Sequence, residues 1–545
     1  MSDLKVNKLV VYNGSENISS VGGCYSYSLG MGKVLDTTIL NDTKKLNELA
    51  LDLRDEYSDF IYSLNRLYID NNLTFEKLSL YFISDVSNKR TEFFDTFISI
   101  CHIIIIKEEI KQKNILEVDL VGCSKEFESS FISIFSDLNI NKKDTNKNNA
   151  YNFYFFRQIK YFTKYLFNLI YFKLNFVNKS FGAIKNLFLT RYPMHFSKDF
   201  IEEKYGSLVK KDDVYLVSIL TDGMHQSHSL KKNNSSLKQL KLFQKEHNIL
   251  LLDIEVTFID LIKSFVYSLY LPLKFKNLTI QKFVFKEIDI SQFLYQEINR
   301  SMTRIPRLLL YKNAIQKIFT KNKVDNFYYY LHEYSYGKFF SYILSQYFKN
   351  TKKIGFQHGP ASMRKMLYFL SKNEVNYSSC DYNRHLPMPD VVLAEDEQSK
   401  KVYEAANYKN VKVMKEIPRL EYLQYIKREN IEKGSLLVAC GLHDGEFIFD
   451  SLKDEIKNNI DKKYYFKLHP RATKNVIINK INESKISNIE ISEEHISKYL
   501  SFIEEVVFTY SSVGIEAYKL GIEVRTISLP NKINESPILD YEGNI

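Results

Sequence analysis

The chain contains no tryptophan, and only five of its 545 residues are cysteine. The cysteines form no Cys-x-x-Cys pair, so neither a disulfide framework nor a zinc site is indicated, and a reducing, cytoplasmic setting fits best. Long apolar runs are also missing: candidates such as Phe265 to Leu273 are bounded by Lys263 and Lys274 and fall short of the roughly 20 residues of a membrane span. The first residues carry no secretory-signal pattern. We therefore expect a cytoplasmic protein that is not integral to a membrane.

The remaining composition is that of an ordinary globular protein, with 45% hydrophobic and 26% charged residues. The length suffices for two or three domains. The net charge of +10 arises from 75 basic and 65 acidic residues, which is modest for this length. Charge therefore matters only where it clusters.

One such cluster lies between Thr145 and Lys198, where no acidic residue occurs. Within it, basic residues interleave with aromatic residues over positions 151–191. This composition is typical of a helix in the interface of an anionic membrane, and equally of an aromatic-rich, buried helix pair with solvated lysines. Binding of single-stranded nucleic acid also uses such residues. Because no recognisable nucleic-acid module surrounds the segment, we expect no nucleic-acid partner and keep the first two interpretations open.

Short apolar runs predict strands, among them Ile103 to Ile106 and Leu116 to Val121. The polar run Asn139 to Asn149 predicts a linker into the aromatic segment. From Phe327 onward, strand and helix patterns alternate, and the alternation restarts after Gly434. Such alternation predicts an α/β fold with parallel sheets flanked by helices. We expect two Rossmann-like domains, residues 1–430 and 431–545, with a helical aromatic and basic insertion at 140–200 in the first.

Two predicted strands in the last quarter of the chain end in polar loops. Tyr464 to Leu468 is followed by His469-Pro470-Arg471, and Glu505 to Tyr510 is followed by Ser511-Ser512-Val513-Gly514. Ligands of an open α/β sheet bind outside the carboxyl ends of its strands, so both loops should face one crevice. The second loop also begins a helix, whose positive end and N–H groups favour a phosphate or diphosphate.

These loops supply candidate side chains for binding the phosphates of a nucleotide. His469 and Arg471 can both donate to a phosphate as a leaving nucleotide gains negative charge. Ser511 and Ser512 can do so from the start of the helix, although a plain N-cap uses the same residue type. Glu516 lies one turn beyond Ser512 and is suited either to binding a ribose diol or to stabilising the first turn of the helix.

Several short motifs resemble one family. The segments concerned are Leu80 to Lys89, Arg191-Tyr192-Pro193 with Lys204 to Leu208, Ile354 to Pro360, Pro389 to Leu393, and Pro418-Arg419. In these segments the chain is similar to bacterial surface-carbohydrate biosynthesis proteins of O-antigen and capsule gene clusters, which are glycosyltransferases of the GT-B type. The Gln-His-Gly and His-Pro elements also resemble those of CMP-Kdo, CMP-sialate and CDP-polyol phosphate transferases. The resemblance implies a GT-B-like fold with a cleft between two Rossmann-like domains, the donor nucleotide in the C-terminal half and the acceptor in the N-terminal half.

His358 is the first candidate for the catalytic base. It follows a predicted strand and should project into the cleft, where an imidazole can accept the proton of an acceptor hydroxyl. Contact with the donor phosphate, together with Gln357 and Gly359, is the alternative, and a purely structural histidine is the third. Asp222 is the rival base at a predicted strand end, although Asp-Gly is also a common turn pair.

Two further residues are predicted at the donor site. Asp444 lies in the first loop of the C-terminal half and would line the nucleotide site. Arg419 follows the predicted strand Val411 to Met414, and its guanidinium fork suits a phosphate or a carboxylate. No Asp-x-Asp pair sits at a convincing strand end and no cluster has metal-ligand spacing, so we expect transfer without a metal or other cofactor.

The sequence therefore predicts a glycosyltransferase that moves a sugar from a nucleotide donor, with a CMP-activated acidic sugar favoured, to a surface polysaccharide or lipid-linked glycan. Contact with an anionic membrane through 151–191 would place it at the inner face of the cytoplasmic membrane. The alternatives are a CDP-polyol phosphate transferase, a non-catalytic nucleotide-sugar-binding scaffold of glycan assembly, and a membrane-interaction protein.

Overall fold

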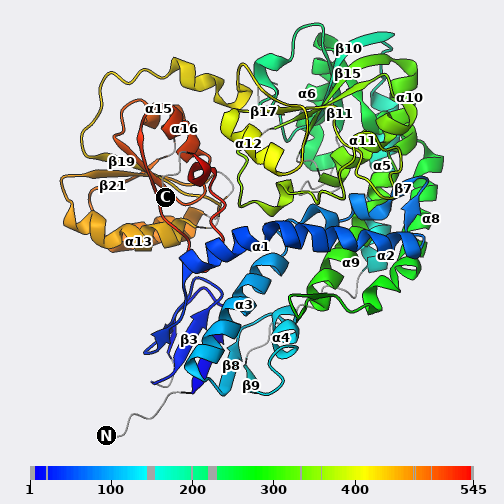
Figure 1. Cartoon of the computed structure of the whole chain (residues 1–545). Helices are drawn as coiled ribbons and strands as arrows, with labels where there is room; N and C mark the ends of the chain where they lie inside the picture. Colours follow the sequence, from blue (N-terminus) through cyan, green and yellow to red (C-terminus); the bar gives the residue numbers. More distant parts are fainter. Residues whose placement is uncertain are drawn as a thin grey trace, which may run out of the picture.

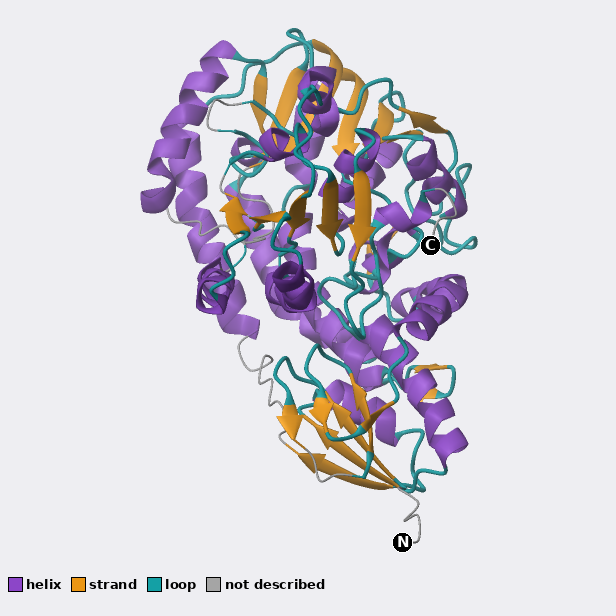
Figure 2. Ribbon diagram, turned by 90° about the vertical axis from the view of Figure 1, so that its left-hand side faces the viewer, coloured by secondary structure: helices purple, strands orange, loops and turns teal. Residues whose placement is uncertain are grey.

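The computed structural model describes residues 7–19, 23–143, 154–197, 201–218, 230–331, 334–357, 359–442, 444–469, 472, 474–492 and 494–541. These residues form three parallel sheets of five, seven and five strands. In Figure 1 the first sheet lies at the bottom, the seven-stranded sheet at the upper right and the C-terminal sheet at the left. Helices form a layer between the first sheet and the other two (Figure 2).

All three sheets follow the same winding rule. Each starts with its first strand in the interior, adds the second and third strands on one side, and adds the later strands on the other. This is the order of a doubly wound sheet, which places a point of reversed strand order at the carboxyl edge. The predicted α/β fold with GT-B-like, Rossmann-like units is confirmed, and the chain carries an additional sheet of this kind at its N-terminal end.

The first sheet has the order β5-β3-β1-β8-β9. Its strands are β1 (Lys8–Tyr12), β3 (Tyr25–Ser28), β5 (Thr38–Ile39), β8 (Glu117–Val121) and β9 (Asn139–Lys143). Its helices are α1 (Thr43–Ser63), α2 (Asn65–Asp70), α3 (Thr96–Lys113) and α4 (Lys125–Ile132), with two short strand pairs, β2 (Ile18–Ser19) with β4 (Val34–Leu35) and β6 (Thr74–Phe75) with β7 (Leu78–Ser79). Two 3-10 turns, η1 (Leu80–Ile83) and η2 (Val86–Asn88), precede α3.

The seven-stranded sheet has the order β12-β11-β10-β15-β16-β17-β18. Its strands are β10 (Ala183–Arg191), β11 (Val214–Ser218), β12 (Ile249–Leu251), β15 (Lys323–Tyr330), β16 (Lys352–Phe356), β17 (Val391–Ala394) and β18 (Val411–Val413). Its helices are α5 (Tyr154–Asn175), α6 (Leu230–Glu246), α7 (Leu252–Glu255), α8 (Phe258–Phe275), α9 (Ser291–Leu309), α10 (Lys312–Lys321), α11 (Tyr334–Tyr347) and α12 (Glu397–Ala405). A hairpin of β13 (Val284–Phe285) and β14 (Ile288–Asp289) lies before α9, and 3-10 turns include η3 (Gly206–Leu208) and η6 (Pro418–Tyr425).

The C-terminal sheet has the order β21-β20-β19-β22-β23. Its strands are β19 (Ser435–Ala439), β20 (Lys463–Lys467), β21 (Ile489–Ser492), β22 (Glu505–Phe508) and β23 (Glu523–Thr526). Its helices are α13 (Gly445–Asn458), α14 (Lys474–Ser484), α15 (Ile496–Leu500) and α16 (Val513–Lys519), and η7 (Pro537–Asp540) follows near the end. The domain boundary expected near residue 431 lies between η6 and β19, and it stays a prediction.

The cores explain why these strands are nearly continuous apolar runs. A parallel sheet covered by helices on both sides buries both of its faces. In β19, Leu436 and Val438 enter the core on one face, whereas Leu437 and Ala439 enter the core on the other. The first two sheets share one larger core, which extends from Leu9 to Met388.

Two local predictions are wrong. Ile103 to Ile106, predicted as a strand, lie inside α3, because the helix is buried on nearly all sides and packing overrides the strand preference of isoleucine. The run from Asn139, predicted as a linker, begins with the edge strand β9. The aromatic segment at 140–200 contains α5, and then β10, an inner strand of the seven-stranded sheet.

The last described segment returns to the first unit. Asn531 donates to the carbonyl of Gly30 (2.9 Å) and accepts from the side chain of Asn41 (2.6 Å). Its own carbonyl lies 3.1 Å from Nε2 of His102, whose pKa is lowered to about 3 by burial. The chain end therefore fastens the C-terminal unit to the N-terminal one.

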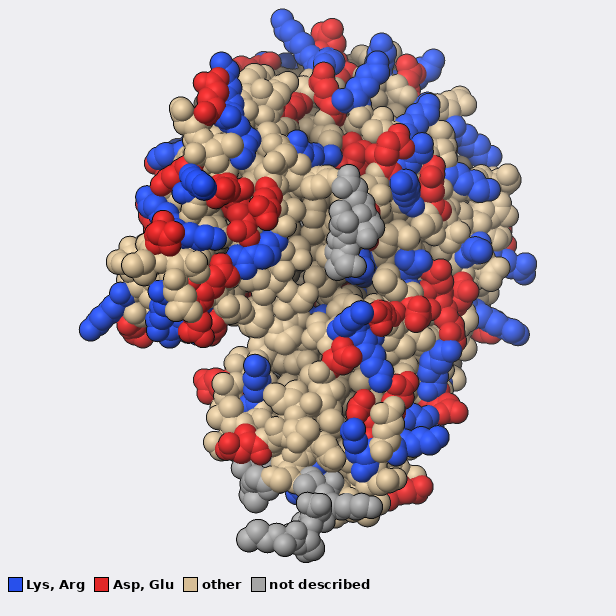
Figure 3. Space-filling view, turned by 60° about the vertical axis from the view of Figure 1, so that its left-hand side comes forward, with Lys and Arg blue, Asp and Glu red and all other residues tan. Residues whose placement is uncertain are grey.

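The surface carries charges of both signs. On the face shown in Figure 3, lysine and arginine interleave with aspartate and glutamate, and the indentation between the lobes is lined mostly by uncharged residues. No helix within the described ranges is both long enough and apolar enough to cross a membrane.

Candidate functional site

The strand order of the C-terminal sheet reverses between β19 and β22, because β20 and β21 lie on one side of β19 and β22 and β23 on the other. Ligands of doubly wound sheets bind at such a point, outside the carboxyl ends of the strands. Two loops border it, one from residue 440 onward after β19 and one from residue 509 onward after β22. The predicted donor-site residues Asp444, Ser511 and Ser512 lie on these two loops.

A hydrogen bond joins the two loops. The hydroxyl of Thr509 donates to Oδ2 of Asp444, and both side chains are buried. Gly441 permits this close approach, because a Cβ atom there would lie 2.9 Å from both the Asp444 carboxylate and the Tyr510 ring. Asp444 therefore ties the β19 loop to the β22 loop at the point of reversed strand order.

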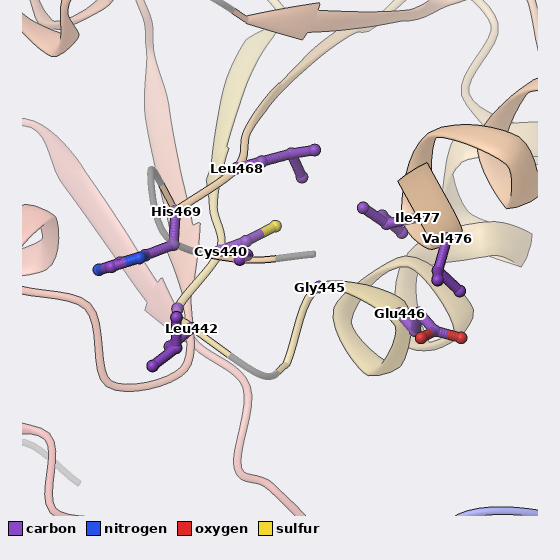
Figure 4. Close-up of a pocket in the computed structure, with 10 residues that line it drawn as sticks. Cys440, Leu442, Gly445, Glu446, Leu468, His469, Val476 and Ile477 are labelled. Carbon is purple, nitrogen blue, oxygen red and sulfur yellow. The ribbon is translucent and has the colours of Figure 1, made fainter. Parts of the chain in front are cut away.

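A pocket of about 170 Å³ opens at the ends of β19 and β20 (Figure 4). His469 and Leu442 lie on one side of it and Ile477 on the other, with Cys440 and Gly445 between them. The ring of His469 points away from Ile477. Gly445 is the first residue of α13, a helix of 14 residues, so the positive end of this helix borders the pocket.

Ser511 and Ser512 lie half-buried at the start of α16. Oγ of Ser511 accepts a hydrogen bond of 3.4 Å from the N–H of Val513. The hydroxyl of Ser512 donates to Oε1 of Glu516 at 3.4 Å, and its side chain makes no capping bond to the helix. Contact of either serine with a donor phosphate stays a prediction.

Gly514 serves the packing of α16 on its strand. A Cβ atom at this position would lie only 2.0 Å from the ring of Phe508 in β22. A glycine is needed here because the helix backbone approaches the ring so closely. The structure thus gives Gly514 a packing role beside its predicted place in the donor loop.

Glu516 and Arg419 meet at the junction of the seven-stranded and C-terminal units. Arg419 donates from Nε and Nη2 to the two carboxylate oxygens of Glu395, both at 2.6 Å, and its Nη1 lies 3.6 Å from Oε1 of Glu516. Burial opposes the charged guanidinium, but the carboxylate of Glu395 outweighs this effect, and the pKa of Arg419 is raised. The hydroxyl of Tyr422 donates to the other oxygen of Glu516. Arg419 and Glu516, both predicted to bind the donor, are therefore paired with other side chains of this chain.

A second ion pair lies beside the first. Asp396 directly follows Glu395 at the end of β17 and accepts from Nζ of Lys519 in α16 at 2.7 Å. The same oxygen accepts from the hydroxyl of Tyr541. Burial works against the charged carboxylate, but these partners outweigh it and lower the pKa of Asp396. The carboxyl end of β17 therefore faces the helix that follows β22.

Gln357 is fully buried at the end of β16, and both polar atoms of its side-chain amide form hydrogen bonds within the chain. Its Oε1 accepts from the N–H of Glu395 (3.0 Å), and its Nε2 donates to the carbonyl of Gly359 (2.8 Å) and to Oγ of Ser399 (3.2 Å). Gln357 thus connects the β16 loop to the β17 loop that carries Glu395. A Cβ atom on Gly359 would meet nothing within 4 Å.

Three predicted residues, His358, Asp222 and Arg471, lie outside the described residues, and their roles stay predictions. Among the residues that the structure does describe, no group of three or more His, Cys, Asp and Glu side chains could hold a metal ion.

Sequence reasoning missed four residues of this region: Gly441, Thr509, Glu395 and Asp396. A signal was present for three of them. Thr509 lies in the same strand-end run as Ser511, and Glu395-Asp396 directly follow the predicted strand Val391 to Ala394. The need for glycine at 441 follows only from the distance between the two loops.

No protein-family model matches the chain, and the search of curated proteins finds no match. Solved structures with a similar course of the chain include the UDP-GlcNAc 2-epimerase from Neisseria meningitidis bound to UDP-GlcNAc, with 14% identity over 63% of this chain and 82% of that chain and a TM-score of 0.32. MurG of Acinetobacter baumannii has 8% identity over 65% of this chain and 82% of that chain, with a TM-score of 0.34. The calicheamicin glycosyltransferase CalG4 has 8% identity over 66% of this chain and 84% of that chain, with a TM-score of 0.35. Similarity at this level says nothing of substrate or reaction.

Proposed function

We propose that the chain is a GT-B-type glycosyltransferase that binds a nucleotide-sugar donor at the carboxyl edge of its C-terminal sheet. The observation that carries this proposal is the pocket at the ends of β19 and β20, which the positive end of α13 borders and which adjoins the point of reversed strand order. His469 lies at one side of this pocket with its ring directed away from Ile477, toward the crevice in which the proposal places the rest of the donor. An imidazole and a helix end both favour a phosphate oxygen. The pocket is smaller than the ~300 Å³ of ordinary ligand sites, so it would hold one end of the donor, with the remainder along the crevice.

The donor is a CMP-activated acidic sugar in this proposal. Support comes from the resemblance of the Gln-His-Gly and His-Pro elements to those of CMP-Kdo and CMP-sialate transferases. The acceptor, a surface polysaccharide or lipid-linked glycan, would bind on the side of the seven-stranded sheet. In the sequence, the proposed bases His358 and Asp222 come after β16 and β11 of this sheet. Arg471, Ser511 and Ser512 would assist His469 at the phosphates without a metal ion.

Two other functions fit the same crevice. A CDP-polyol phosphate transferase would need the same contacts to a cytidine nucleotide and would transfer a phosphate-linked group instead of a sugar. A non-catalytic scaffold of glycan assembly would bind the nucleotide sugar without converting it to products.

A thermal-shift panel of CMP, CDP, UDP, GDP and ADP tests the donor site. A ligand at about 100 times its Kd should stabilise the chain by about 2.7 kcal/mol. We expect CMP to raise the Tm of the wild-type chain and to have little effect on His469→Ala. His385→Ala is the matched control, because His385 is half-buried and does not line the pocket. Equal shifts of Tm in both variants would show that the donor does not bind in this pocket. A larger shift with UDP or GDP than with CMP would show that the donor is not a CMP-sugar.

Turnover separates the remaining alternatives. On addition of acceptor, the wild-type chain should release CMP from a CMP-sugar, whereas His358→Ala should release none. The rise in Tm that CMP causes should persist in His358→Ala. A scaffold would release no CMP in either protein. Release of CMP from a CDP-polyol but not from a CMP-sugar would favour the phosphate transferase.

A further inference from the structure

Helices α5 and α8 lie side by side on a third helix, α9. The hydroxyl of Tyr154 in α5 donates to the carbonyl of Ser268 in α8 at 2.7 Å. Both helices also contact α9: Arg307 lies 4.0 Å from the ring centroid of Tyr161 in α5, and the hydroxyl of Ser264 in α8 donates to the carbonyl of Pro306. The two helices therefore pack against each other and on α9, and we call their exposed sides together the α5–α8 face.

The α5–α8 face is apolar, although the outer side of a surface helix is normally polar. On α5, exposed large apolar side chains recur every three or four residues, with one gap of eight, so they lie on one side of the helix. They are Phe156, Ile159, Phe167, Ile170 and Leu174. The same pattern occurs on α8, with Ile259, Ile262, Val266, Leu269 and Leu273. Their exposed fractions range from 37% for Leu269 to 80% for Leu174. A contiguous apolar surface of this kind marks an interaction site.

The exposed charges on helices α5 and α8 are all positive. Arg157, Lys160 and Lys164 of α5 are exposed, as is Lys263 of α8. Helix α5 contains no acidic residue. The single acidic residue of α8, Asp260, is buried and is used by its own helix start, where it accepts from Thr257, and by Asn313. The two helices therefore offer apolar side chains and positive charge together, and neither carries an exposed carboxylate.

We propose that the α5–α8 face docks onto an anionic membrane, with both helices parallel to the bilayer surface and their apolar side chains in the headgroup and acyl boundary. Basic residues beside an apolar helix face are the features that hold helices in this position. The expectation from sequence placed such contact on 151–191 alone, whereas the structure adds α8 as the second half of the surface. The proposal does not rest on the donor site, because α5 and α8 lie at the opposite side of the molecule from the C-terminal sheet (Figure 1).

The charge pattern argues against a second copy of this chain as the occupant. In a two-fold symmetric contact the same patch meets itself. Lys160 and Lys164 would then face the basic residues of the other copy, with no exposed acidic residue of either helix to pair with them. Anionic headgroups supply the opposite charge directly.

Vesicle co-sedimentation of the full chain tests this proposal. We expect binding to vesicles of equal parts phosphatidylcholine and phosphatidylglycerol, and weak binding to phosphatidylcholine alone. Ile262→Ser with Val266→Ser should lower the apparent affinity at least about tenfold, because two apolar side chains are lost from the acyl boundary. Lys160→Glu with Lys164→Glu should reduce binding to the anionic vesicles and its sensitivity to salt.

The matched control is Leu116→Ser with Ile460→Ser, which removes two side chains of 62% and 81% exposure from other parts of the surface. Circular dichroism melting establishes that each variant is folded, which exposed positions should permit. The proposal fails if the wild-type chain does not bind anionic vesicles at low salt, or if control and face variants lose binding equally. If the face variants instead abolish self-association in sedimentation velocity while vesicles remain unbound, the face is an interface between copies and the membrane is excluded.

Discussion

Arg419 holds both carboxylate oxygens of Glu395 at 2.6 Å, and its third nitrogen, Nη1, reaches Glu516 of the C-terminal unit at 3.6 Å. Glu395 follows β17 of the seven-stranded sheet, while Arg419 also reaches toward Glu516 in the first turns of α16. Both side chains of the pair are largely buried, with 14% of Arg419 and 3% of Glu395 exposed. One guanidinium thus neutralises carboxylates from both units at the junction between them.

Removal of this guanidinium should destabilise the chain strongly. Arg419→Met leaves Glu395 as a buried charge without its two closest donors, which typically costs about 3–5 kcal/mol. We expect a loss of this size in the free energy of unfolding, measured by urea denaturation. Arg525→Met is the control, because Arg525 also binds carboxylates with several nitrogens but is 39% exposed. Its loss should be about 1 kcal/mol or less, and equal losses in the two variants would contradict the role given to the buried pair.

The two glycines predicted at the donor site should respond differently to alanine. Gly514→Ala forces a Cβ atom against the Phe508 ring, whereas Gly359→Ala places one in open space. Overpacking of this kind costs about 1–3 kcal/mol. We expect a lower urea midpoint for Gly514→Ala and nearly no change for Gly359→Ala. A normal midpoint for Gly514→Ala would mean that α16 shifts away from β22 at little cost.

The strand ends of the C-terminal unit could be predicted because their signals are local. The run Tyr464 to Leu468 and the run ending near Tyr510 are short, apolar and followed by polar residues, and the structure places β20 and β22 there. The alternation of strand and helix patterns likewise predicted parallel sheets. Each of these inferences depended on residues close together in sequence.

Features that depend on distant partners could not be predicted in this way. Four consecutive isoleucines favour a strand locally, yet α3 is buried so completely that its helix needs apolar residues on nearly every side. The contact of Asn531 with Gly30 joins positions 501 residues apart. The first sheet was not predicted as a unit of its own. Leu116 to Val121 was predicted as a strand and contains β8, but β3 and β5 are short and follow β1 without intervening helices.

Glu297 should make the stability of the chain depend on pH. This carboxyl in α9 is buried and accepts a hydrogen bond of 2.6 Å from Thr96. Burial raises its pKa to about 8, only partly offset by that hydrogen bond. In the unfolded chain a glutamate has a pKa of about 4.3, so between the two values the folded state holds a proton that the unfolded state has lost. The free energy of unfolding should therefore fall as the pH rises through this interval.

Glu297→Gln removes this titration while keeping the shape of the side chain and an oxygen for Thr96. Urea midpoints of both proteins between about pH 5 and about pH 8 measure the effect. We expect the variant to gain stability relative to the wild-type chain as the pH increases. Parallel curves for the two proteins would show that Glu297 does not keep its proton in the folded state.

The hydrogen bond from Thr509 to Asp444 should affect nucleotide binding as well as stability. Thr509→Val keeps the volume of the side chain but removes the hydroxyl that joins the β19 and β22 loops. Loss of a donor to a buried carboxylate costs about 1–3 kcal/mol. We expect weaker nucleotide binding by calorimetry in Thr509→Val and recovery of most of it in Thr509→Ser. Thr351→Val controls for stability alone, because the buried hydroxyl of Thr351 donates to the carbonyl of Val324, in the seven-stranded unit. If both valine variants bind the nucleotide equally well, the two joined loops do not shape the donor site.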